Sequence, residues 1–397
     1  MPDLTSPLLQ RPGAVDLRVV EALGNNAVAN DGTGNHGTGS HATGTDGTGT
    51  SPAGPAPAGP APAGVAAHYG DPMREQRRLA AGAAMVDLSH RGVLTVAGPD
   101  RLSWLHSLTS QHLSDLAPGQ SVETLVLSPK GHLEHSLHLV DDGERVWITV
   151  EPGTVEALHA WLDSMRFMLR VEVADVTGDY AVLATCGDPS EAELRERLGL
   201  APVAVWRDPW PAIEAGALVG DTAAYGPVVG HPGVEWSLTE IVVARSALAA
   251  LARREDLEWA GLWALEALRI AAWRPRLGAE TDHRTIAHEA DWLRTGVHLH
   301  KGCYRGQETI ARVHNLGRPP RRLVFLHLDG SGHDLPAPGT GIRLGERTVG
   351  RITSVARHFE DGPIALAMVK RNTDPEADLL VEAEMPVSAS QTVIVAP

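Results

Sequence analysis

The sequence contains very little cysteine and lysine. Cys186 and Cys303 are the only cysteines in 397 residues, which excludes a disulfide framework and a four-thiolate zinc or iron–sulfur site within one chain. Lysine occurs only at Lys130, Lys301 and Lys370, although Lys and Arg together number 34. Because arginine supplies nearly every other cation, a remaining lysine can be retained for its compact ammonium group. Retention by chance is the alternative.

Long apolar runs are also missing. No stretch approaches the ~20 residues that span a bilayer. The start, MPDLTSPLLQRPG, lacks the basic region and apolar core of a secretory signal. We therefore expect a cytoplasmic protein without a membrane partner. The net charge of −15 argues against wrapping duplex DNA, so we expect no direct nucleic-acid partner.

Two low-complexity tracts dominate the first part of the chain. Residues 32–50 are rich in Gly and Thr, and residues 51–64 contain only Ser, Pro, Ala and Gly. Neither tract can bury enough apolar surface to offset the entropy of ordering, so residues 1–66 are predicted to be a disordered leader and linker. GTGNHG at 32–37 matches the dinucleotide pattern G-x-G-x-x-G but has no flanking strand or helix, so we assign it no phosphate site.

The rest of the chain predicts an α+β fold, because antiparallel strands are interrupted by helices without strict βα alternation. Helices are expected at 99–110 and 153–168, and a helical zone over 239–272. After Pro319-Pro320, short alternating strands predict a small antiparallel barrel or sandwich. Strands are expected before that point at 92–98, 122–127, 133–140, 145–150, 171–176 and 180–186.

The densest polar cluster is KGCYRGQETIARVHN, residues 301–315. Gly302 and Gly306 allow a tight backbone turn immediately before a helix that is predicted to run from residue 307 to 314.

The turn places Cys303 near the N-terminus of that helix, with Lys301 and Arg305 on either side. All three features favour the thiolate over the thiol. We interpret Cys303 as a reactive thiol and a candidate catalytic residue, the alternative being a small buried apolar residue. Cys186 ends an apolar strand and is assigned to the core.

The run Lys301-Gly302-Cys303-Tyr304-Arg305-Gly306-Gln307-Glu308 resembles the signature of the YgfZ-type folate-binding proteins. These are relatives of the mitochondrial factors that help to mature 4Fe–4S proteins. They belong to the superfamily of the glycine-cleavage T-protein, a tetrahydrofolate aminomethyltransferase. Residues 85–120, the turn SPKG at 128–131 and the helix GLWALEALRI at 261–270 are similar to further parts of that fold, so the resemblance covers about residues 70–397.

The resemblance implies an α+β, T-protein-like cloverleaf of subdomains around a central opening that holds tetrahydrofolate or a derivative. Residues 67–318 would form the folate-binding region, with two interleaved subdomains, and residues 319–397 a C-terminal β-barrel. The anionic tail of a folate would be clamped by Arg or Lys. The candidate cofactor-binding residues are Lys301, Gly302, Tyr304, Arg305, Gly306, Gln307, Glu308, Glu235 and Arg269. Arg274, Arg276 and Arg284 could also line the opening, although a solvated helix end explains these arginines equally well.

The sequence departs from the T-protein pattern at two acidic positions. His231 replaces the first Glu of the T-protein stretch Gly-Glu-Asp-Gly-x-Glu, although Glu235 persists, and HLEHSLH follows SPKG where the T-protein has acidic residues. Aminomethyl transfer needs carboxylates near the folate nitrogen, so both changes argue against the T-protein's own reaction. Trp273 stands where glycine is usual in the YgfZ-like pattern.

The histidine-rich run also allows a metal site to be considered. On a strand over 133–140, His132, Glu134 and His138 would share one face while His135 points away. No fourth ligand is evident, so we expect no metal there. His283, His288, His298 and His300 are expected to lie mostly at the surface.

Two functions with chemistry remain open, besides a third option of a folate sensor or scaffold without chemistry. The first is a folate-binding accessory protein that supports iron–sulfur cluster assembly or repair, and the tRNA modification that depends on it, with iron–sulfur client or assembly proteins as partners. The second is a folate-dependent one-carbon transferase of the aminomethyl type. A single motif cysteine cannot hold a cluster alone, so Cys303 would relay sulfur or iron with a partner, or act as a nucleophile.

Overall fold

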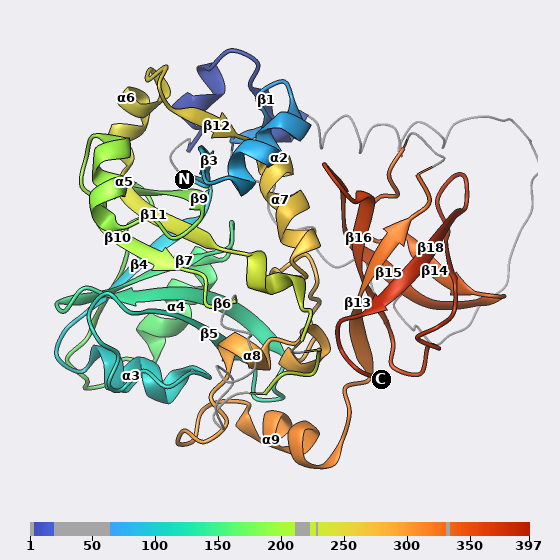
Figure 1. The fold of residues 1–397 in the computed structure, drawn as a ribbon. Coiled ribbons are helices and arrows are strands. Elements are labelled where there is room, and N and C mark those ends of the chain that lie inside the picture. Colours follow the sequence, from blue (N-terminus) through green and yellow to red (C-terminus); the bar gives the residue numbers. More distant parts are fainter. Residues whose placement is uncertain (1–3, 20–63, 211–222, 228, 331–333) are drawn as a thin grey trace, which may run out of the picture.

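Two five-stranded sheets and a closed barrel make up the fold. The computed structural model describes residues 4–19, 64–210, 223–227, 229–330 and 334–397. Figure 1 shows the two sheets stacked on one side of the molecule and the barrel, drawn in red, on the other. This mixed architecture confirms the predicted α+β class. No helix in the described part of the chain is both long and apolar enough to cross a membrane.

The first sheet has the strand order β10-β11-β9-β3-β12 and is antiparallel except for the pair β3 and β12. Its strands are β3 (Ala84–Asp87), β9 (Tyr180–Cys186), β10 (Ala204–Arg207), β11 (Leu238–Ala244) and β12 (Glu258–Ala260). Its helices are α2 (Pro72–Ala80), α5 (Glu191–Leu198) and α6 (Leu248–Ala252), with the 3-10 turns η3 (Pro232–Glu235) and η4 (Arg245–Ala247). Cys186 is buried at the end of β9, as predicted.

The helical zone predicted over 239–272 was wrong at its start, because residues 238–244 form β11. The run LTEIVVA is rich in β-branched residues and buried on both faces. Such a run suits a central strand, in this case between β10 and β9.

The second sheet has the order β5-β6-β7-β4-β8 and is antiparallel throughout. In β7, Ile148 packs in one core and Trp147 in the other, so both faces of this sheet are covered. The strands expected between residues 92 and 186 are confirmed. The sheet's elements are β4 (Gly92–Ala97), α3 (Arg101–Leu108), β5 (Ser121–Leu127), β6 (Leu133–Asp141), β7 (Arg145–Val150), α4 (Val155–Ser164) and β8 (Glu172–Asp175).

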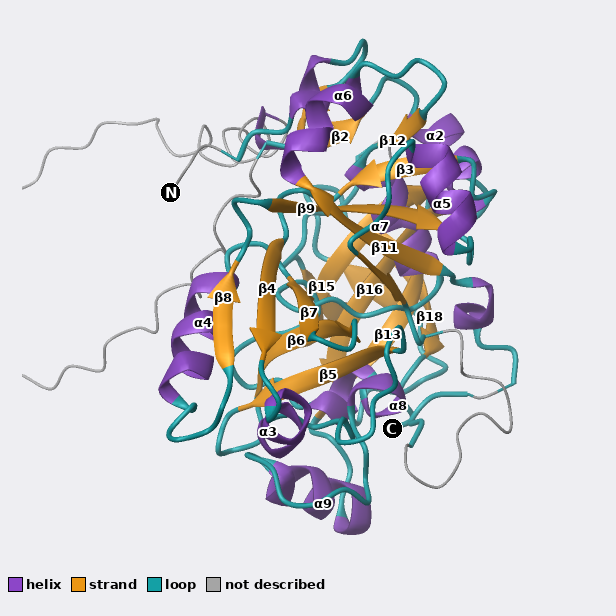
Figure 2. Cartoon of the chain, turned by 90° about the vertical axis from the view of Figure 1, so that its left-hand side faces the viewer, coloured by secondary structure: helices purple, strands orange, loops and turns teal. Residues whose placement is uncertain are grey.

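The C-terminal unit is a closed barrel in the order β13-β16-β15-β14-β17-β18, which confirms the predicted small antiparallel barrel. One set of apolar side chains fills the barrel and a second set faces the helix α7 (Leu262–Ala271), which lies between the sheets and the barrel (Figures 1 and 2). The strands are β13 (Arg321–Leu328), β14 (Gly341–Leu344), β15 (Arg347–His358), β16 (Gly362–Lys370), β17 (Leu379–Val381) and β18 (Val387–Val393). The segment between α7 and the barrel contains η5 (Ala287–Ala290), α8 (Leu293–Gly296) and α9 (Gln307–Leu316).

Part of the predicted disordered leader is ordered. Residues 4–19 contain the 3-10 turn η1 (Pro7–Gln10) and β1 (Val15–Asp16), and β1 pairs with β2 (Ala66–His68). Leu8 is fully buried in the core under α6, and Arg11 donates hydrogen bonds to carbonyl oxygens of Ala252 and Arg254, 2.8 Å away in each case. The prediction was therefore wrong for residues 4–19, and residues 20–63 lie outside the described part of the chain.

The buried position of Leu8 gives a direct stability test. We expect Leu8→Ala to lower the free energy of unfolding by about 2–5 kcal/mol, because it leaves a cavity in the core. Gln10→Ala, at an exposed position of the same turn, should change it by less than about 0.5 kcal/mol. Urea unfolding followed by circular dichroism measures both. Equal effects of the two substitutions would show that the N-terminal segment does not contribute to the core.

Candidate functional site

The motif 301–308 forms a loop that lies against the turn SPKG. Gly306 has φ 82°, and a Cβ at this position would lie 2.5 Å from the carbonyl oxygen of Ser128. Thr309 Oγ1 donates a hydrogen bond of 2.8 Å to the carbonyl oxygen of Lys130. Two segments of the resemblance, far apart in the sequence, are therefore in direct contact, and glycine is required at residue 306 for both conformation and space.

Lys301 anchors this loop to the end of α3. Its buried ammonium donates hydrogen bonds to the backbone carbonyl oxygens of His106, Thr109 and Gln111, and lies 4.9 Å from the centre of the Tyr304 ring. A cation at the C-terminus of a helix satisfies carbonyl groups that have no partner within the helix. Burial lowers the pKa of Lys301 to about 8. The three backbone contacts account for the retained lysine.

Cys303 is exposed at the tip of the loop. On its C-terminal side, Arg305 forms an ion pair of 2.9 Å with Glu134 and lies over the ring of Trp161, 5.5 Å from its centre. The loop is thus braced at Lys301 and at Arg305, and the thiol between them is accessible to another molecule.

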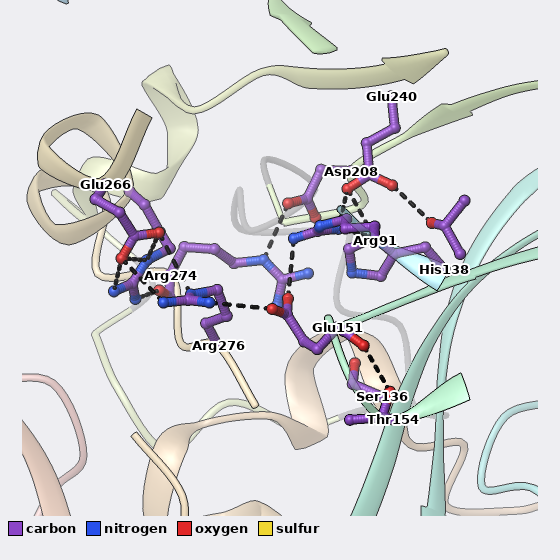
Figure 3. A network of polar contacts seen from close by, with 12 residues as sticks. Arg91, Ser136, His138, Glu151, Thr154, Asp208, Glu240, Glu266, Arg274 and Arg276 are labelled. Atoms are coloured by element: carbon purple, nitrogen blue, oxygen red, sulfur yellow. Dashed lines mark hydrogen bonds and ion pairs between the residues drawn. The ribbon is translucent and has the colours of Figure 1, made fainter. Parts of the chain in front are cut away.

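A cavity of about 40 Å³ lies where the two sheets, α7 and the segment after α7 meet. Its apolar wall is formed by Trp236, Leu238, Leu265, Leu277 and Trp292. By volume the cavity admits a few water molecules. Its remaining wall is polar and consists largely of arginines and carboxylates, several of which are drawn in Figure 3.

Arg91 is one of the buried cations of this wall. Arg91 Nη1 lies 2.5 Å from Glu240 Oε1, and Arg91 Nη2 lies 2.9 Å from Glu151 Oε1. Glu240 also accepts a hydrogen bond of 2.7 Å from Thr149. Burial opposes ionisation of Glu240, but Arg91 and His138 outweigh it and lower its pKa to about 2. Glu240 is therefore anionic at neutral pH.

Arg276 and Arg269 continue the network toward the barrel. Arg276 lies 3.1 Å from Glu151 and 3.3 Å from Glu266, and Arg269 lies 2.8 Å from Glu266 and 3.0 Å from Glu280. Burial opposes ionisation of Glu266, yet the two arginines lower its pKa to about 2. The side chains of Arg276 and Glu266 are 34% and 27% exposed, so this pair forms the open end of the cavity.

Arg274 connects the two sheets through two carboxylates. It lies 2.9 Å from Glu123 on β5 and 3.0 Å from Asp208, which follows β10. Glu123 also accepts hydrogen bonds from Trp292 and Thr295. Each of the four arginines of the wall thus contacts two carboxylates. This arrangement compensates the desolvation of buried charges.

His138 also lines the cavity and lies beside the Arg91–Glu240 pair. Its ring is stacked on Trp206 with centroids 3.8 Å apart, and its Nδ1 lies 3.0 Å from Glu240 and 3.3 Å from Arg91. With the proton on Nδ1, His138 donates to Glu240 and keeps the lone pair on Nε2. A histidine oriented by a carboxylate in this way is suited to general base chemistry.

The structure does not bring the candidate residues predicted from the sequence together in one site. Arg269, Arg274 and Arg276 line the cavity. Arg284 and Glu235 are exposed, and neither lines it. The loop residues Lys301, Gly302, Cys303, Tyr304, Arg305, Gly306, Gln307 and Glu308 do not line it either. A chemical role of Cys303 stays a prediction.

The sequence analysis did not predict most of the carboxylates in the cavity wall. For two of them, the position of an acidic residue inside an apolar strand could have indicated the site. Glu123 lies in the apolar strand SVETLVL and Glu240 in LTEIVVA, and an acid inside such a strand needs a cationic partner. Glu151, Asp208 and Glu266 carried no comparable signal.

The structure also bears on two further residues that the sequence analysis named, His288 and Trp273. His288 was expected near the surface but is fully buried. Trp273 has φ 58°, a left-handed conformation that glycine adopts without strain, in accord with the glycine usual at this position in the family pattern. In the described ranges no group of three or more His, Cys, Asp or Glu is placed to hold a metal ion.

Comparisons with known proteins agree with this fold. Residues 68–210 match the family model of the GCVT N-terminal domain. A chloroplastic protein of Arabidopsis thaliana that carries a transferase name is 28% identical over 69% of this chain and 62% of its own length. An aminomethyltransferase of Moorella thermoacetica is 28% identical over 77% of this chain and 83% of its own.

Among solved structures, the glycine cleavage system aminomethyltransferase T of Bartonella henselae superposes with a TM-score of 0.65 at 19% identity. The superposition covers 84% of this chain and 90% of that protein. The chain therefore has the T-protein-like fold with its C-terminal barrel. The matches support the superfamily of the glycine-cleavage T-protein, whereas the YgfZ-type assignment stays a prediction.

Two buried histidines predict a loss of stability in mild acid. Burial lowers the pKa of His231 to about 3 and that of His288 to about 4, so both stay neutral in the folded state below pH 6.5 while the unfolded chain takes up protons. Each should lower the free energy of unfolding by about 1 kcal/mol between pH 6.5 and 5.5. His288→Leu should remove its share of this pH dependence, and His283→Gln, at an exposed site, should not. Urea unfolding at both pH values measures this, and equal slopes for the two variants would contradict it.

Proposed function

We propose that this protein binds tetrahydrofolate in the central cavity and catalyses a one-carbon transfer of the aminomethyl type. The proposal is supported above all by the cavity at the meeting point of the sheets and α7, which combines an apolar wall with anionic carboxylates and a histidine. The T-protein-like fold and relatives that carry the name aminomethyltransferase point in the same direction.

The free volume of about 40 Å³ is well below the roughly 300 Å³ or more that ligand pockets enclose. Binding therefore requires side chains to move. Arg276 is the best placed to do so, because it is partly exposed and Glu266, one of its two carboxylate partners, lies at the open end. If Arg276 turns toward solvent, Glu151 stays paired with Arg91 and Glu266 with Arg269, and the carboxylate oxygens that Arg276 leaves can accept from the amino and N–H groups of a pterin edge. Trp236 and Leu265 then cover the ring.

When bound, tetrahydrofolate supplies the nitrogen that accepts or releases the one-carbon unit. In this arrangement, His138 takes up a proton at Nε2 while Glu240 holds the proton on Nδ1. Glu151 keeps Arg91 and Glu266 keeps Arg269 as a partner when Arg276 turns outward, and these arginines lower the pKa values of the two carboxyl groups against the effect of burial. Anionic carboxylates stabilise positive charge that develops on an amine donor.

The proposed acceptor Glu266 gives the first test. We expect Glu266→Gln to weaken binding of tetrahydrofolate by about 10- to 100-fold, because a hydrogen bond to a charged group contributes about 1.5–3 kcal/mol. Calorimetric titration measures the affinity. Glu308→Gln, an exposed change on α9, should bind like the wild type. A wild-type protein that binds no tetrahydrofolate would contradict the proposed function.

A second function, support of iron–sulfur cluster assembly or repair, is favoured by Cys303. Its thiol is exposed on a braced loop outside the cavity, where a partner protein can reach it, and the motif around it resembles that of the YgfZ-type proteins. A single exposed thiol can pass sulfur or iron to a partner without holding a cluster.

The substitution Cys303→Ser separates the two functions. In the transferase, Cys303→Ser should keep folate affinity and turnover with a methylamine-type donor within about twofold, because Cys303 does not line the cavity. In the accessory function, a deletion strain loses activity of 4Fe–4S enzymes and thiomethylated tRNA, and Cys303→Ser fails to restore them whereas Glu308→Gln succeeds. Normal activities in the deletion strain would exclude the accessory function.

A further inference from the structure

The turn that follows α4 exposes three large apolar side chains in a row. Phe167 is 82% exposed, Met168 97% and Leu169 45%. The other large apolar residues that are exposed in the described ranges stand singly in the sequence. Together the three side chains present roughly 400 Å² of apolar surface, a patch of the size that often binds another molecule. We call residues 167–169 the apolar tip.

The apolar tip has a strained backbone. Phe167 has φ 48°, in the left-handed region that a bulky residue adopts only at a cost in free energy. The amide of Leu169 donates a hydrogen bond of 3.0 Å to the carbonyl oxygen of Arg166 and closes the turn around it. Glycine would adopt this φ without strain. Strain that the rest of the fold maintains is common at binding sites, so the Phe167 side chain is a candidate contact residue.

Hydrogen bonds fix the apolar tip at both of its ends. Before it, Trp104 Nε1 of α3 donates a hydrogen bond of 3.0 Å to the carbonyl oxygen of Met165. After it, Arg170 forms an ion pair of 2.7 Å with Asp100, and its backbone amide donates a hydrogen bond of 2.9 Å to the same carboxylate. The side chains are therefore presented from a fixed support, which lowers the entropy that is lost on binding.

The helices that support the apolar tip also support the loop of Cys303. Helices α3 and α4 pack in one core of the second sheet. Lys301 donates to carbonyl oxygens at the end of α3, and Arg305 lies over the ring of Trp161 on α4. Trp161 is about one helical turn before Met165, where the tip begins. A protein that is seated on the apolar tip is thus well placed to contact the loop of Cys303.

Charge and area indicate what the apolar tip binds. Arg166 and Arg170, on either side of it, are paired with Asp163 and Asp100, and the chain has a net charge of −15. Neither arginine is therefore free to attract an anionic lipid surface. The patch is about half of the roughly 800 Å² that each partner contributes to a stable interface. It suits a transient complex with another protein better than a permanent dimer of this chain.

We propose that the apolar tip docks into an apolar pocket of the partner protein that contacts Cys303. This inference rests on the second proposed function, the support of iron–sulfur cluster assembly or repair. Phe167 and Met168 enter the pocket, since aromatic side chains and Met are enriched where proteins meet. The fixed turn presents both side chains before the partner arrives, and the docked partner is held over the thiol.

The test measures 4Fe–4S enzyme activity in a strain that lacks the gene and expresses variants at a limiting level. The double variant Phe167→Ser, Met168→Ser should restore less than about a fifth of the wild-type activity, because loss of interface anchors weakens docking by about 30-fold or more. The apolar double variant Phe167→Leu, Met168→Leu should restore most of it. Met385→Ser, a matched change of an exposed Met between β17 and β18, should restore it fully.

Two measurements on purified protein separate docking from folding and from thiol chemistry. Phe167→Gly should unfold at the same urea concentration as the wild type or a higher one, since glycine relieves the strain, and yet should restore little activity. In the Ser double variant, Cys303 should react with iodoacetamide within about twofold of the wild-type rate, because the tip does not alter the loop that holds it.

The outcomes distinguish this inference from the function on which it rests. Normal 4Fe–4S activities in the deletion strain overturn the accessory function and the docking site together. An impaired strain that the Ser double variant restores as well as the wild type overturns the docking site alone. Equal loss in Met385→Ser, or a Phe167→Gly protein that unfolds more easily than the wild type, also overturns it. So does sedimentation of the wild type, but not of the Ser double variant, with phosphatidylserine vesicles, which would assign the tip to a membrane.

Discussion

The buried network of arginines and carboxylates is the interaction on which the rest of the structure depends. It links Glu240 of the first sheet, Glu123 of the second and Arg269 of α7, and it reaches the barrel at Ser354. Removal of one partner would leave an uncompensated charge, a change that typically costs about 3–5 kcal/mol. The network therefore constrains how the sheets and the barrel pack. It also keeps the centre of the fold polar, where a purely apolar core would leave no site.

A second consequence of the network is that the proposed folate site is closed in the free protein. The arginines occupy space that a pterin ring would need, and only Arg276 has partial access to solvent. Ligand binding would then replace one set of partners of the carboxylates with another set. Cys303 lies apart from this exchange, on a loop braced by Lys301. The fold thus offers two separate positions for the proposed chemistry, the central cavity and the exposed thiol of Cys303.

Local patterns predicted much of the fold, but long-range pairing was beyond them. The strands between residues 92 and 186 were predicted within a few residues, whereas the barrel was predicted as a unit and its strand β17 was not. The strand β11 was taken for helix, because an apolar run buried on both faces has no period of two. Leu8 is ordered only through contacts with residues far along the chain. Likewise, Arg91 and Glu240 are 149 residues apart, and no local pattern pairs them. The position of the motif 301–308 outside the cavity wall likewise depends on the tertiary fold, which no local pattern predicts.

A crystal structure of the protein with tetrahydrofolate tests the central claim most directly. The account predicts electron density for the pterin ring between Trp236 and Leu265, with its amino edge at Glu151 and Glu266 and the Arg276 side chain turned outward. Tetrahydrofolate bound elsewhere on the protein, with Arg276 still paired to both carboxylates, would contradict it.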